Sequence, residues 1–507
     1  MAIVQALKTG PGGRRQLQLL SPATLEPIGK IDCMTSEEVR AIVEKARKAQ
    51  PAWAALTFEQ RGEYMLKALD VLLERQDDFI DVIEREGPKP RLDVVQMDIF
   101  PTCDALGFYA NNAAKFLHTQ QVQLHGVLAA TKDLYIMYKP MGVVAVISPW
   151  NGPFVLAIVP AIQALMAGNT VVIKPSSVTP MSGKLVEDLF QMAGLPDGVL
   201  SVLVGDSETG QALLEAEIDK VTFTGSVSVG RQVARTCAER LIPCTLELGG
   251  KDALIVCADA NLENAAGGAV AGSFVNTGQY CCGTERVYVV DSVANEFTRK
   301  VVERTSRLRQ ATEGDFDVGT LFTPDQLETV ERHVADAVAR GARVLIGGRR
   351  NPTLPGLYYE PTVLVDVNHD MLLMREETFG PVMPIMRVAD EDEAIRLAND
   401  SSFGLSSSVW TEDIEKGLEI ARRIVSGSTN INDMAVTFGV CEAPFGGVRQ
   451  SGIGRSNGEY GLKGYCNVHP VIVAKLSGAV AAGMYPTSVE KARAMQEMCR
   501  NIFGTQV

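Results

Sequence analysis

One cysteine has surroundings that suit covalent chemistry. Cys281 follows a segment of small residues, 265–274, and comes shortly before an apolar run that begins at Val287. A cysteine at the junction of two elements, beneath a loop of backbone amides, can have a lowered pKa and act as a nucleophile. The alternative is an inert core residue, which is the usual state of a free cysteine. Position alone leaves both interpretations open.

A glutamate offers acid–base chemistry. Glu247 lies between Leu246 and Leu248, and two glycines follow. Poor solvation raises the pKa of a carboxyl group, which suits a general base near neutral pH. The alternative is a strand-end glutamate that pairs with Lys251 or with a backbone amide, because ion-pair networks also perturb carboxylates.

The turn Phe223-Thr224-Gly225-Ser226 follows a predicted strand and opens a predicted helix. Small residues there let a pyrophosphate approach the helix N-terminus, where free N–H groups and the helix dipole favour anions. A G-x-G-x-x-G motif does not follow any predicted strand, so an ordinary Rossmann fingerprint is absent. A simple tight turn would explain the glycine equally well.

The elements that must position these residues alternate between strands and helices. Apolar runs that alternate with helix-length segments are typical of a parallel sheet buried on both faces. The sequence therefore predicts an α/β fold with two doubly wound α/β domains, of which the first binds a nucleotide. Strands are predicted at 143–147, 171–174, 200–204, 221–224, 253–256, 287–290, 342–346, 382–386, 407–410 and 429–432. Helices are predicted at 155–166, 182–193, 265–274, 296–308, 324–340, 391–399 and 414–424.

The remaining segments give weaker signals. The first segment is expected to alternate helices and loops, with a capping box from Thr35 to Glu38. Residues 120–139 lack a helical period and predict a hairpin, and the tail from Leu476 has a helical pattern over 488–503. Further helices are expected at 59–74, 77–86 and 94–117.

Composition excludes several classes of protein. The 507 residues, 46% hydrophobic and 21% charged, are ordinary for a soluble globular chain, and about 150 residues per domain suggests roughly three domains. A net charge of −13 argues against nucleic-acid binding, which needs a basic face. The cysteines and histidines form no metal-binding motif. The N-terminus lacks a signal-peptide pattern, which predicts reduced thiols in the cytoplasm. The apolar stretch 154–173 contains Pro160 and Asn169, so a buried helix and strand explain it better than a membrane span.

Short motifs then occur in a fixed order along nearly the whole chain. The series reads Ser21-Pro22-Ala23-Thr24, Pro149-Trp150-Asn151, Lys174-Pro175-Ser176, Ala193-Gly194-Leu195-Pro196-Asp197-Gly198, Phe223-Thr224-Gly225-Ser226, Glu247-Leu248-Gly249-Gly250-Lys251, Gly278-Gln279-x-Cys281, Glu376-Glu377-Thr378-Phe379-Gly380-Pro381 and Pro444-Phe445-Gly446-Gly447. Each motif alone is weak. In this order and at this spacing, the series resembles the aldehyde dehydrogenase superfamily of the NAD(P)-dependent, hydrolytic type.

The resemblance implies roles for three residues in the chemistry. Cys281 would attack the aldehyde carbon and carry a thiohemiacetal and then a thioester. The side-chain amide of Asn151 and the backbone N–H of Cys281 match the family's oxyanion hole. Glu247 would activate the water that releases a free carboxylic acid. Family members that pass the acyl group to coenzyme A tend to lack this carboxylate, so an acylating enzyme is the weaker alternative, as is a non-catalytic member.

The resemblance also implies a cofactor, NAD or NADP. Lys174 would bond the adenosine ribose, and Glu377 would bond the nicotinamide ribose. Many NAD-preferring relatives carry a glutamate three residues after the lysine, where this chain has Ser177. A serine does not repel a 2′-phosphate, so NADP should be tolerated or preferred, unless Ser177 is neutral and NAD binds through Lys174. The other expected cofactor-binding residues are Trp150, Gly225, Ser226 and Phe379.

The substrate pocket is predicted at Tyr280, Met434 and Phe438. The loop 433–442 has no lysine or arginine, which favours an uncharged aliphatic or aromatic aldehyde. A cation from the segment 94–117 would instead suit a semialdehyde, and loop residues that only pack the loop would leave the substrate open.

The resemblance implies the following organisation. Residues 1–119 and 140–248 form the NAD(P)-binding domain, and 249–447 form the catalytic domain. Residues 120–139 and 448–475 form a small β oligomerisation arm and connecting segment, and 476–507 form the tail. Relatives exchange strands through this arm, so a homodimer or homotetramer is expected, with no nucleic-acid, membrane or metal partner.

Overall fold

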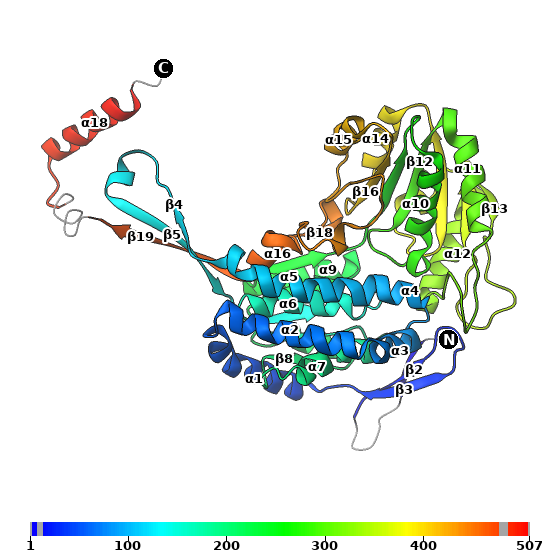
Figure 1. Cartoon of the computed structure of the whole chain (residues 1–507), viewed down its shortest axis with the longest axis horizontal. Coiled ribbons are helices and arrows are strands. Elements are labelled where there is room, and N and C mark those ends of the chain that lie inside the picture. Colours follow the sequence, from blue (N-terminus) through cyan, green and yellow to red (C-terminus); the bar gives the residue numbers. More distant parts are fainter. Residues whose placement is uncertain (1–2, 8–13, 476–484, 505–507) are drawn as a thin grey trace. The chain divides into compact units, whose positions relative to one another are not determined.

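The computed structural model describes residues 3–7, 14–475 and 485–504. The chain forms two compact units. The first holds the described residues up to Phe116 together with Pro140–Cys466, and the second holds Leu117–Lys139 and the described residues after Cys466. Figure 1 shows the elements of both units, coloured along the chain. All of the predicted site residues lie in the first unit.

The first unit contains a six-stranded sheet in the order β18-β10-β9-β6-β7-β8. Strands β6 to β10 run parallel, and β18 pairs antiparallel with β10. The central strands are valine-rich and almost fully buried, because helices α1, α6 and α8 pack against them. The strands are β6 Val143–Ile147, β7 Thr170–Lys174, β8 Leu200–Val202, β9 Lys220–Thr224, β10 Cys244–Glu247 and β18 Gly452–Ile453. The helices around this sheet are α1 Ser36–Ala54, α2 Phe58–Glu74, α3 Gln76–Glu86, α6 Val155–Met166, α7 Pro180–Met192, α8 Ser207–Glu215, α9 Val227–Arg240 and α16 Gly458–Lys463.

A seven-stranded sheet in the same unit has the order β13-β14-β15-β12-β11-β16-β17. Only β13 runs antiparallel to its neighbour in this sheet. Successive residues of β11 alternate between two cores, since Ile255 packs in one cluster and Leu254 and Val256 in the other. The strands are β11 Asp252–Val256, β12 Thr284–Val290, β13 Arg343–Ile346, β14 Thr362–Val365, β15 Val382–Val388, β16 Ser407–Trp410 and β17 Asn430–Ile431. The helices are α10 Leu262–Phe274, α11 Asp291–Thr305, α12 Pro324–Ala339, α13 Leu372–Arg375, α14 Glu391–Asn399 and α15 Ile414–Arg423.

These two sheets confirm the predicted α/β class and most of the predicted elements. The stretch 154–173 forms α6 and β7, both fully buried. The helices in the described part of the chain all fall short of the length and hydrophobicity that a membrane crossing requires. Strands β10 and β14 escape prediction, and β10 mixes polar and apolar side chains, so it has no apolar run to mark it.

The expectation of helices and loops in the first segment is wrong at its start. Strands β1 (Val4–Leu7), β2 (Gln16–Leu20) and β3 (Pro27–Asp32) form an antiparallel sheet before α1. In β2 the buried leucines Leu17 and Leu19 alternate with partly exposed glutamines, which is the period of a strand with one covered face. Helix α1 does begin at the predicted Thr35–Glu38 capping box.

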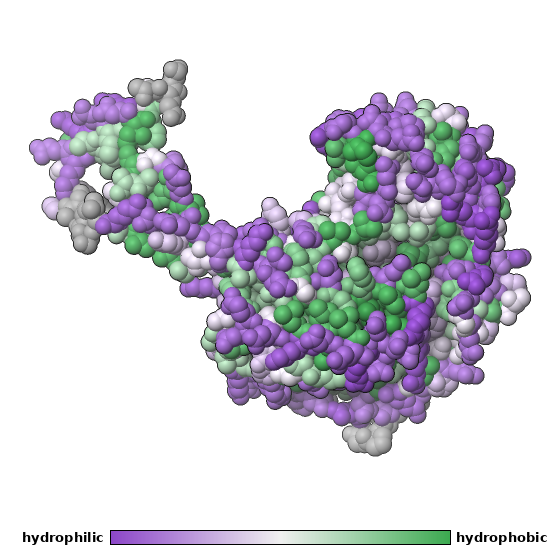
Figure 2. Space-filling view, viewed as in Figure 1, coloured by the Kyte–Doolittle hydropathy of each residue, from purple (hydrophilic) through white to green (hydrophobic). Residues whose placement is uncertain are grey.

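The helix predicted at 94–117 is interrupted. It consists of α4 (Arg91–Val94), a π-helical turn (Val95–Ile99) and α5 (Phe100–Leu117). The Phe100 N–H donates to the Val95 carbonyl, five residues back. Pro101 has no N–H and its ring clashes with the carbonyl four residues earlier, so a regular helix cannot run through this point. Figure 2 shows hydrophobic side chains gathered over the region of α2 to α5 on an otherwise mainly hydrophilic face.

The second unit contains the hairpin predicted at 120–139. Strands β4 (Gln120–Val122) and β5 (Lys132–Pro140) pair antiparallel, and β19 (Cys466–Ala474) completes a sheet in the order β19-β5-β4. Helix α18 (Val489–Phe503) confirms the helical pattern predicted over 488–503. Of the predicted tail, residues 476–484 and 505–507 lie outside the described residues.

Candidate active site

The carboxyl ends of the parallel strands in the first sheet gather the predicted residues. Asn151 follows β6, Lys174 ends β7, Gly225 follows β9 and Glu247 ends β10. Parallel strands bring such ends together at one edge of the sheet. Cys281 comes from the other sheet, just before β12.

A cavity of about 290 Å³ lies at this edge and is lined from both sheets. Its lining includes these predicted residues: Trp150, Asn151, Gly225, Ser226, Glu247, Cys281, Glu377 and Phe379. Two other predicted residues lie outside the lining. Lys174 is buried at the end of β7, where burial lowers the pKa of its ammonium group to about 8. Ser177 lies half-buried between β7 and α7.

The loop before Cys281 has an unusual backbone. Asn276, Thr277 and Gly278 all have positive φ, at 50°, 59° and 69°. Residues other than glycine rarely adopt this conformation, and such strain is held only where the surroundings over-determine it. A Cβ at Gly278 would lie 2.2 Å from the Gly380 carbonyl oxygen, so only glycine fits there. The loop therefore presses closely on the segment before β15 and sets the position of Cys281.

Buried amides hold this loop in place. The Gln279 side chain donates to the carbonyls of Asn276 at 3.1 Å and Thr320 at 3.0 Å, and its oxygen accepts from the Phe322 N–H at 2.9 Å. Asn151 Nδ2 donates to the Gln279 carbonyl at 3.1 Å. An amide nitrogen carries two hydrogens, so Asn151 keeps a second N–H beside Cys281.

The Cys281 thiol does not have the lowered pKa that its position suggests. Contact with the Cys282 thiol and burial together raise the pKa of Cys281 well above the usual range. Lysine, arginine and histidine are all missing from the described residues that line the three cavities around Cys281. A thiolate at this position therefore needs a positive charge or a base that arrives with a ligand or sits in the cavity.

Glu247 lines the same cavity as Cys281, and its carboxyl group is buried. Burial raises the pKa of its carboxyl group to about 8. Oε1 accepts a hydrogen bond from Ser456 Oγ at 3.0 Å. Oε2 is buried without a hydrogen-bond partner among the described residues. A buried oxygen left unpaired is costly unless a water or ligand meets it, so Oε2 is available to the cavity that it shares with Cys281.

The alternative pairing of Glu247 with Lys251 is not formed. The Lys251 ammonium instead contacts Glu285, which also accepts from the Thr378 N–H at 2.8 Å and the Phe379 N–H at 2.7 Å. Next to them, Glu377 accepts from the Gly250 N–H at 2.9 Å. Burial, together with the charge of Glu285, raises the pKa of Glu377 to about 8.

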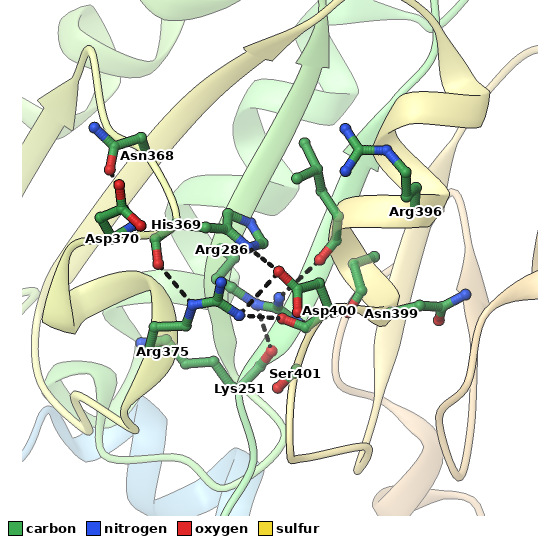
Figure 3. Close-up of polar contacts among 12 residues, drawn as sticks. Lys251, Arg286, Asn368, His369, Asp370, Arg375, Arg396, Asn399, Asp400 and Ser401 are labelled. Carbon is green, nitrogen blue, oxygen red and sulfur yellow. Dashed lines mark hydrogen bonds and ion pairs between the residues drawn. The ribbon is translucent and has the colours of Figure 1, made fainter.

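A polar network extends from Lys251 through the buried Arg286 to the exposed Arg375 and Asp400 (Figure 3). Arg286 Nε donates to the Lys251 carbonyl at 2.8 Å, and the same guanidinium donates to the Leu397 and Ala398 carbonyls at the end of α14. Arg375 and His369 both contact the Asp400 carboxylate. The start of β11 is thereby tied to α13 and α14, which keeps Lys251 and Glu285 in register.

A second, larger cavity of about 370 Å³ reaches Cys281 from the other side. The three predicted pocket residues, Tyr280, Met434 and Phe438, line it. The Tyr280 hydroxyl is already bonded to the Ala435 carbonyl at 3.2 Å, so it presents mainly its ring. Cys281 and Asn151 line both large cavities and stand where the two meet.

Other residues shape the site without a signal that marks them in the sequence. Lys89 and Asp98 form a buried ion pair of 2.7 Å, and Lys89 also donates to the Asn151 carbonyl at 3.3 Å. Asp98 accepts from the N–H groups of Phe154 and Val155 at the start of α6. Their partners are remote in sequence, so neither spacing nor composition pairs them. Asn276 and Gln279 do lie in the motif around Cys281, and their side chains prove to be structural.

Comparison with known proteins decides the family. Residues 9–471 match the model described as the aldehyde dehydrogenase family. The chain belongs to this family. It is therefore an NAD(P)-dependent aldehyde dehydrogenase.

Individual relatives agree with this assignment. The aldehyde dehydrogenase is 38% identical over 444 residues to a 4,4'-diapolycopene aldehyde oxidase of Methylomonas sp, covering 87% of this chain and 83% of the relative. It is 40% identical over 457 residues to a putative succinate-semialdehyde dehydrogenase [NADP(+)] of Mycolicibacterium smegmatis, covering 89% and 87%. A solved aldehyde dehydrogenase of Mycobacterium tuberculosis, complexed with NAD+, superposes with a TM-score of 0.86 at 36% identity, covering 90% and 94%.

The buried Lys89–Asp98 pair generates a stability prediction. Lys89→Met should lower the free energy of unfolding by about 3–5 kcal/mol, because Asp98 is left charged and unpaired in the interior. Lys89→Met/Asp98→Asn should recover most of this loss, because the asparagine oxygen can still accept from the start of α6. Urea unfolding monitored by tryptophan fluorescence measures both variants. Equal losses in the single and the double variant would contradict the prediction.

Proposed function

We propose that the enzyme oxidises an uncharged aldehyde to the free carboxylic acid through a covalent intermediate on Cys281. One observation carries this proposal: Cys281 stands at the meeting point of two cavities. One cavity has the acid–base and anion-binding groups, and the other has an uncharged lining. A nucleophile at such a junction can hold the substrate carbon between its side chain and a cofactor.

In the proposed reaction the Cys281 thiol releases its proton to solvent water as the sulfur bonds to the aldehyde carbon, and the carbonyl oxygen becomes an oxyanion. The free N–H of Asn151 and the Cys281 backbone N–H stabilise that charge. When bound, the oxidised nicotinamide carries a positive charge and accepts the hydride that leaves the carbon. Glu247 Oε2 then takes a proton from water, whose oxygen attacks the thioester. The acid leaves, and the proton returns to the sulfur.

The residues fit the cofactor. Ser226 caps the N-terminus of helix α9 (Val227–Arg240), and Gly225 and Ser226 line the cavity at this helix end, where the helix dipole favours an anion. Phe379 packs edge-on against Trp150 at 5.5 Å between ring centroids. We assign the pyrophosphate to Gly225 and Ser226, the nicotinamide ribose to Glu377, and the adenosine ribose to Lys174. A preference for NADP would follow from Ser177, which brings no carboxylate toward a 2′-phosphate, and the M. smegmatis relative is named for NADP(+).

A semialdehyde of a dicarboxylic acid is the second candidate substrate, because the M. smegmatis relative is named as a succinate-semialdehyde dehydrogenase. A substrate carboxylate needs a cation in the pocket. The described residues that line the cavity of about 370 Å³ include no lysine, arginine or histidine. The segment 94–117 contributes Gln96, Met97, Phe100 and Pro101 to the lining, and no cation. The cavity therefore favours the uncharged aldehyde.

The second unit has an edge strand that suits pairing in a homodimer or homotetramer. Strand β19 lies at one edge of its sheet and exposes Val468 and Ile472, and exposed edge strands readily pair with another chain.

Coenzyme A acylation and a non-catalytic role both fit poorly with a buried Glu247 beside Cys281. The cytoplasmic location and the division into cofactor-binding and catalytic domains stay predictions.

Cys281→Ala should abolish aldehyde-dependent formation of reduced nicotinamide, by about 10³-fold or more, because no other group can carry the acyl intermediate. Absorbance of the reduced nicotinamide measures the rate, and equilibrium binding of the oxidised cofactor checks that the site is intact. Cys103→Ala, a partly buried cysteine outside the cavity linings, is the matched control and should keep turnover. Turnover that survives in Cys281→Ala would refute the covalent route.

Glu247→Gln should slow steady-state turnover by about 10²- to 10⁴-fold, because water loses its base. The first turnover should persist as a burst of reduced nicotinamide, since the thioester still forms. In the native enzyme kcat should rise as the pH increases through about 8, the pKa of Glu247, because only the deprotonated carboxylate accepts a proton. The variant should lose this rise. An unaltered pH profile in the variant would assign the base elsewhere.

Ser177→Glu should shift the ratio of kcat/KM for NADP to that for NAD toward NAD by about 10- to 100-fold, through repulsion of the 2′-phosphate. Ser177→Gln has nearly the same size without the charge and should shift the ratio much less. Initial rates with both cofactors measure the effect. Equal shifts in the two variants would show that size, and not charge, matters at this position.

A further inference from the structure

The cavity of about 370 Å³ opens to solvent through a rim of apolar side chains. Phe100 is 65% exposed, Val436 41% and Val440 42%, and all three line the cavity. Single exposed apolar residues are ordinary, but apolar residues gathered at one opening mark a binding surface. No charged residue occurs among the described residues that line the cavity, so the apolar character continues from the rim to Cys281.

A π-helical turn in the backbone positions Phe100 at this rim. The π-helical turn Val95–Ile99 lies directly before Phe100, and π-turns often occur at functional sites. Asp98, inside the turn, is held by Lys89 and by the start of α6. Gln96, Met97 and Phe100 line the cavity. The buried ion pair thus anchors the turn on one side while the other side carries Phe100 to the opening.

Cations near the turn are already bound elsewhere. The Lys89 ammonium is buried and paired with Asp98. Arg91 pairs with Asp77, Asp81 and Glu84. Neither lines the cavity. A ligand that enters past Phe100 therefore meets a lining of uncharged side chains.

We propose that the enzyme prefers aldehydes with a long apolar chain, which extends from Cys281 through the cavity and rests against Phe100, Val436 and Val440. Phe100 is then a specificity-determining residue for chain length. This inference rests on the proposed function, because it places the aldehyde carbon at Cys281. Burial of each further methylene favours binding in proportion to its area, until the chain passes the rim.

The first experiment measures kcat/KM for unbranched aldehydes from butanal to decanal, with succinic semialdehyde as the charged comparison. Each added methylene should raise kcat/KM about three- to fourfold, the factor that corresponds to about 0.8 kcal/mol. Succinic semialdehyde should be poorer than butanal. Values that stay level or fall from hexanal onward, or a preference for succinic semialdehyde, would overturn the proposal.

The second experiment tests the rim. Phe100→Asn should lower the ratio of kcat/KM for decanal to that for butanal by about tenfold, because the end of the long chain loses its apolar contact. Val440→Asn, in a different segment, should lower the ratio in the same direction. Leu241→Asn replaces a leucine that is 90% exposed and lies outside the cavity, and it should keep the native ratio. A native ratio in both rim variants would overturn the role of the rim.

Failure of this inference can be told apart from failure of the proposed function. Turnover of butanal that depends on Cys281, without a gain from longer chains, would overturn the chain-length preference alone. Absence of turnover with every aldehyde, in a protein that binds the cofactor, would overturn the proposed function as well.

Discussion

The active site depends on a strained loop whose strain is held by buried amides. Three successive residues before Cys281 adopt left-handed backbone conformations, which only a rigid environment maintains. The Gln279 side chain supplies that environment by bonding the loop to itself and to the chain before α12. Because Asn151 is bonded to the same loop, the proposed nucleophile Cys281 and the proposed oxyanion donor Asn151 are held together. One set of hydrogen bonds thus fixes two groups that come from different sheets.

Low polarity around this loop governs the chemistry. Burial raises the pKa of Glu247 and of Glu377 to about 8, and burial with the neighbouring thiol raises the pKa of Cys281 further above its usual range. The carboxyl groups of Glu247 and Glu377 therefore favour the protonated form at neutral pH more than an exposed glutamate does. A cationic cofactor ring and a nascent oxyanion would interact strongly in such surroundings, since few water dipoles compete with them.

The sequence predicts much of this arrangement where the signal is local. The apolar runs of β6 and α6 have their predicted bounds because α6 is buried throughout and β6 is buried up to its last residue, Ile147. The neighbours of Glu247 and Cys281 leave a structural alternative open for each, and the order of the motifs along the chain is what singles out both residues. The thiol pKa could not be predicted, because it depends on how the Cys282 side chain turns. The Lys89–Asp98 pair could not be predicted for a related reason. Lys89 contacts the Asn151 carbonyl only after segments that are remote in the sequence have packed together.

Pro101 signals a break in the helix, but the sequence does not show which side chains the break repositions. A proline near the start of a long helical pattern signals a break, and the break is present as a π-helical turn. Which side chains the extra residue turns toward the substrate cavity depends on what anchors the turn, and the anchor is Asp98 beneath the start of α6. The same carboxylate that stabilises the first turn of α6 therefore also sets the side of the cavity on which Phe100 lies. Packing at the start of α6 and the shape of the opening of the cavity of about 370 Å³ thus depend on the same carboxylate.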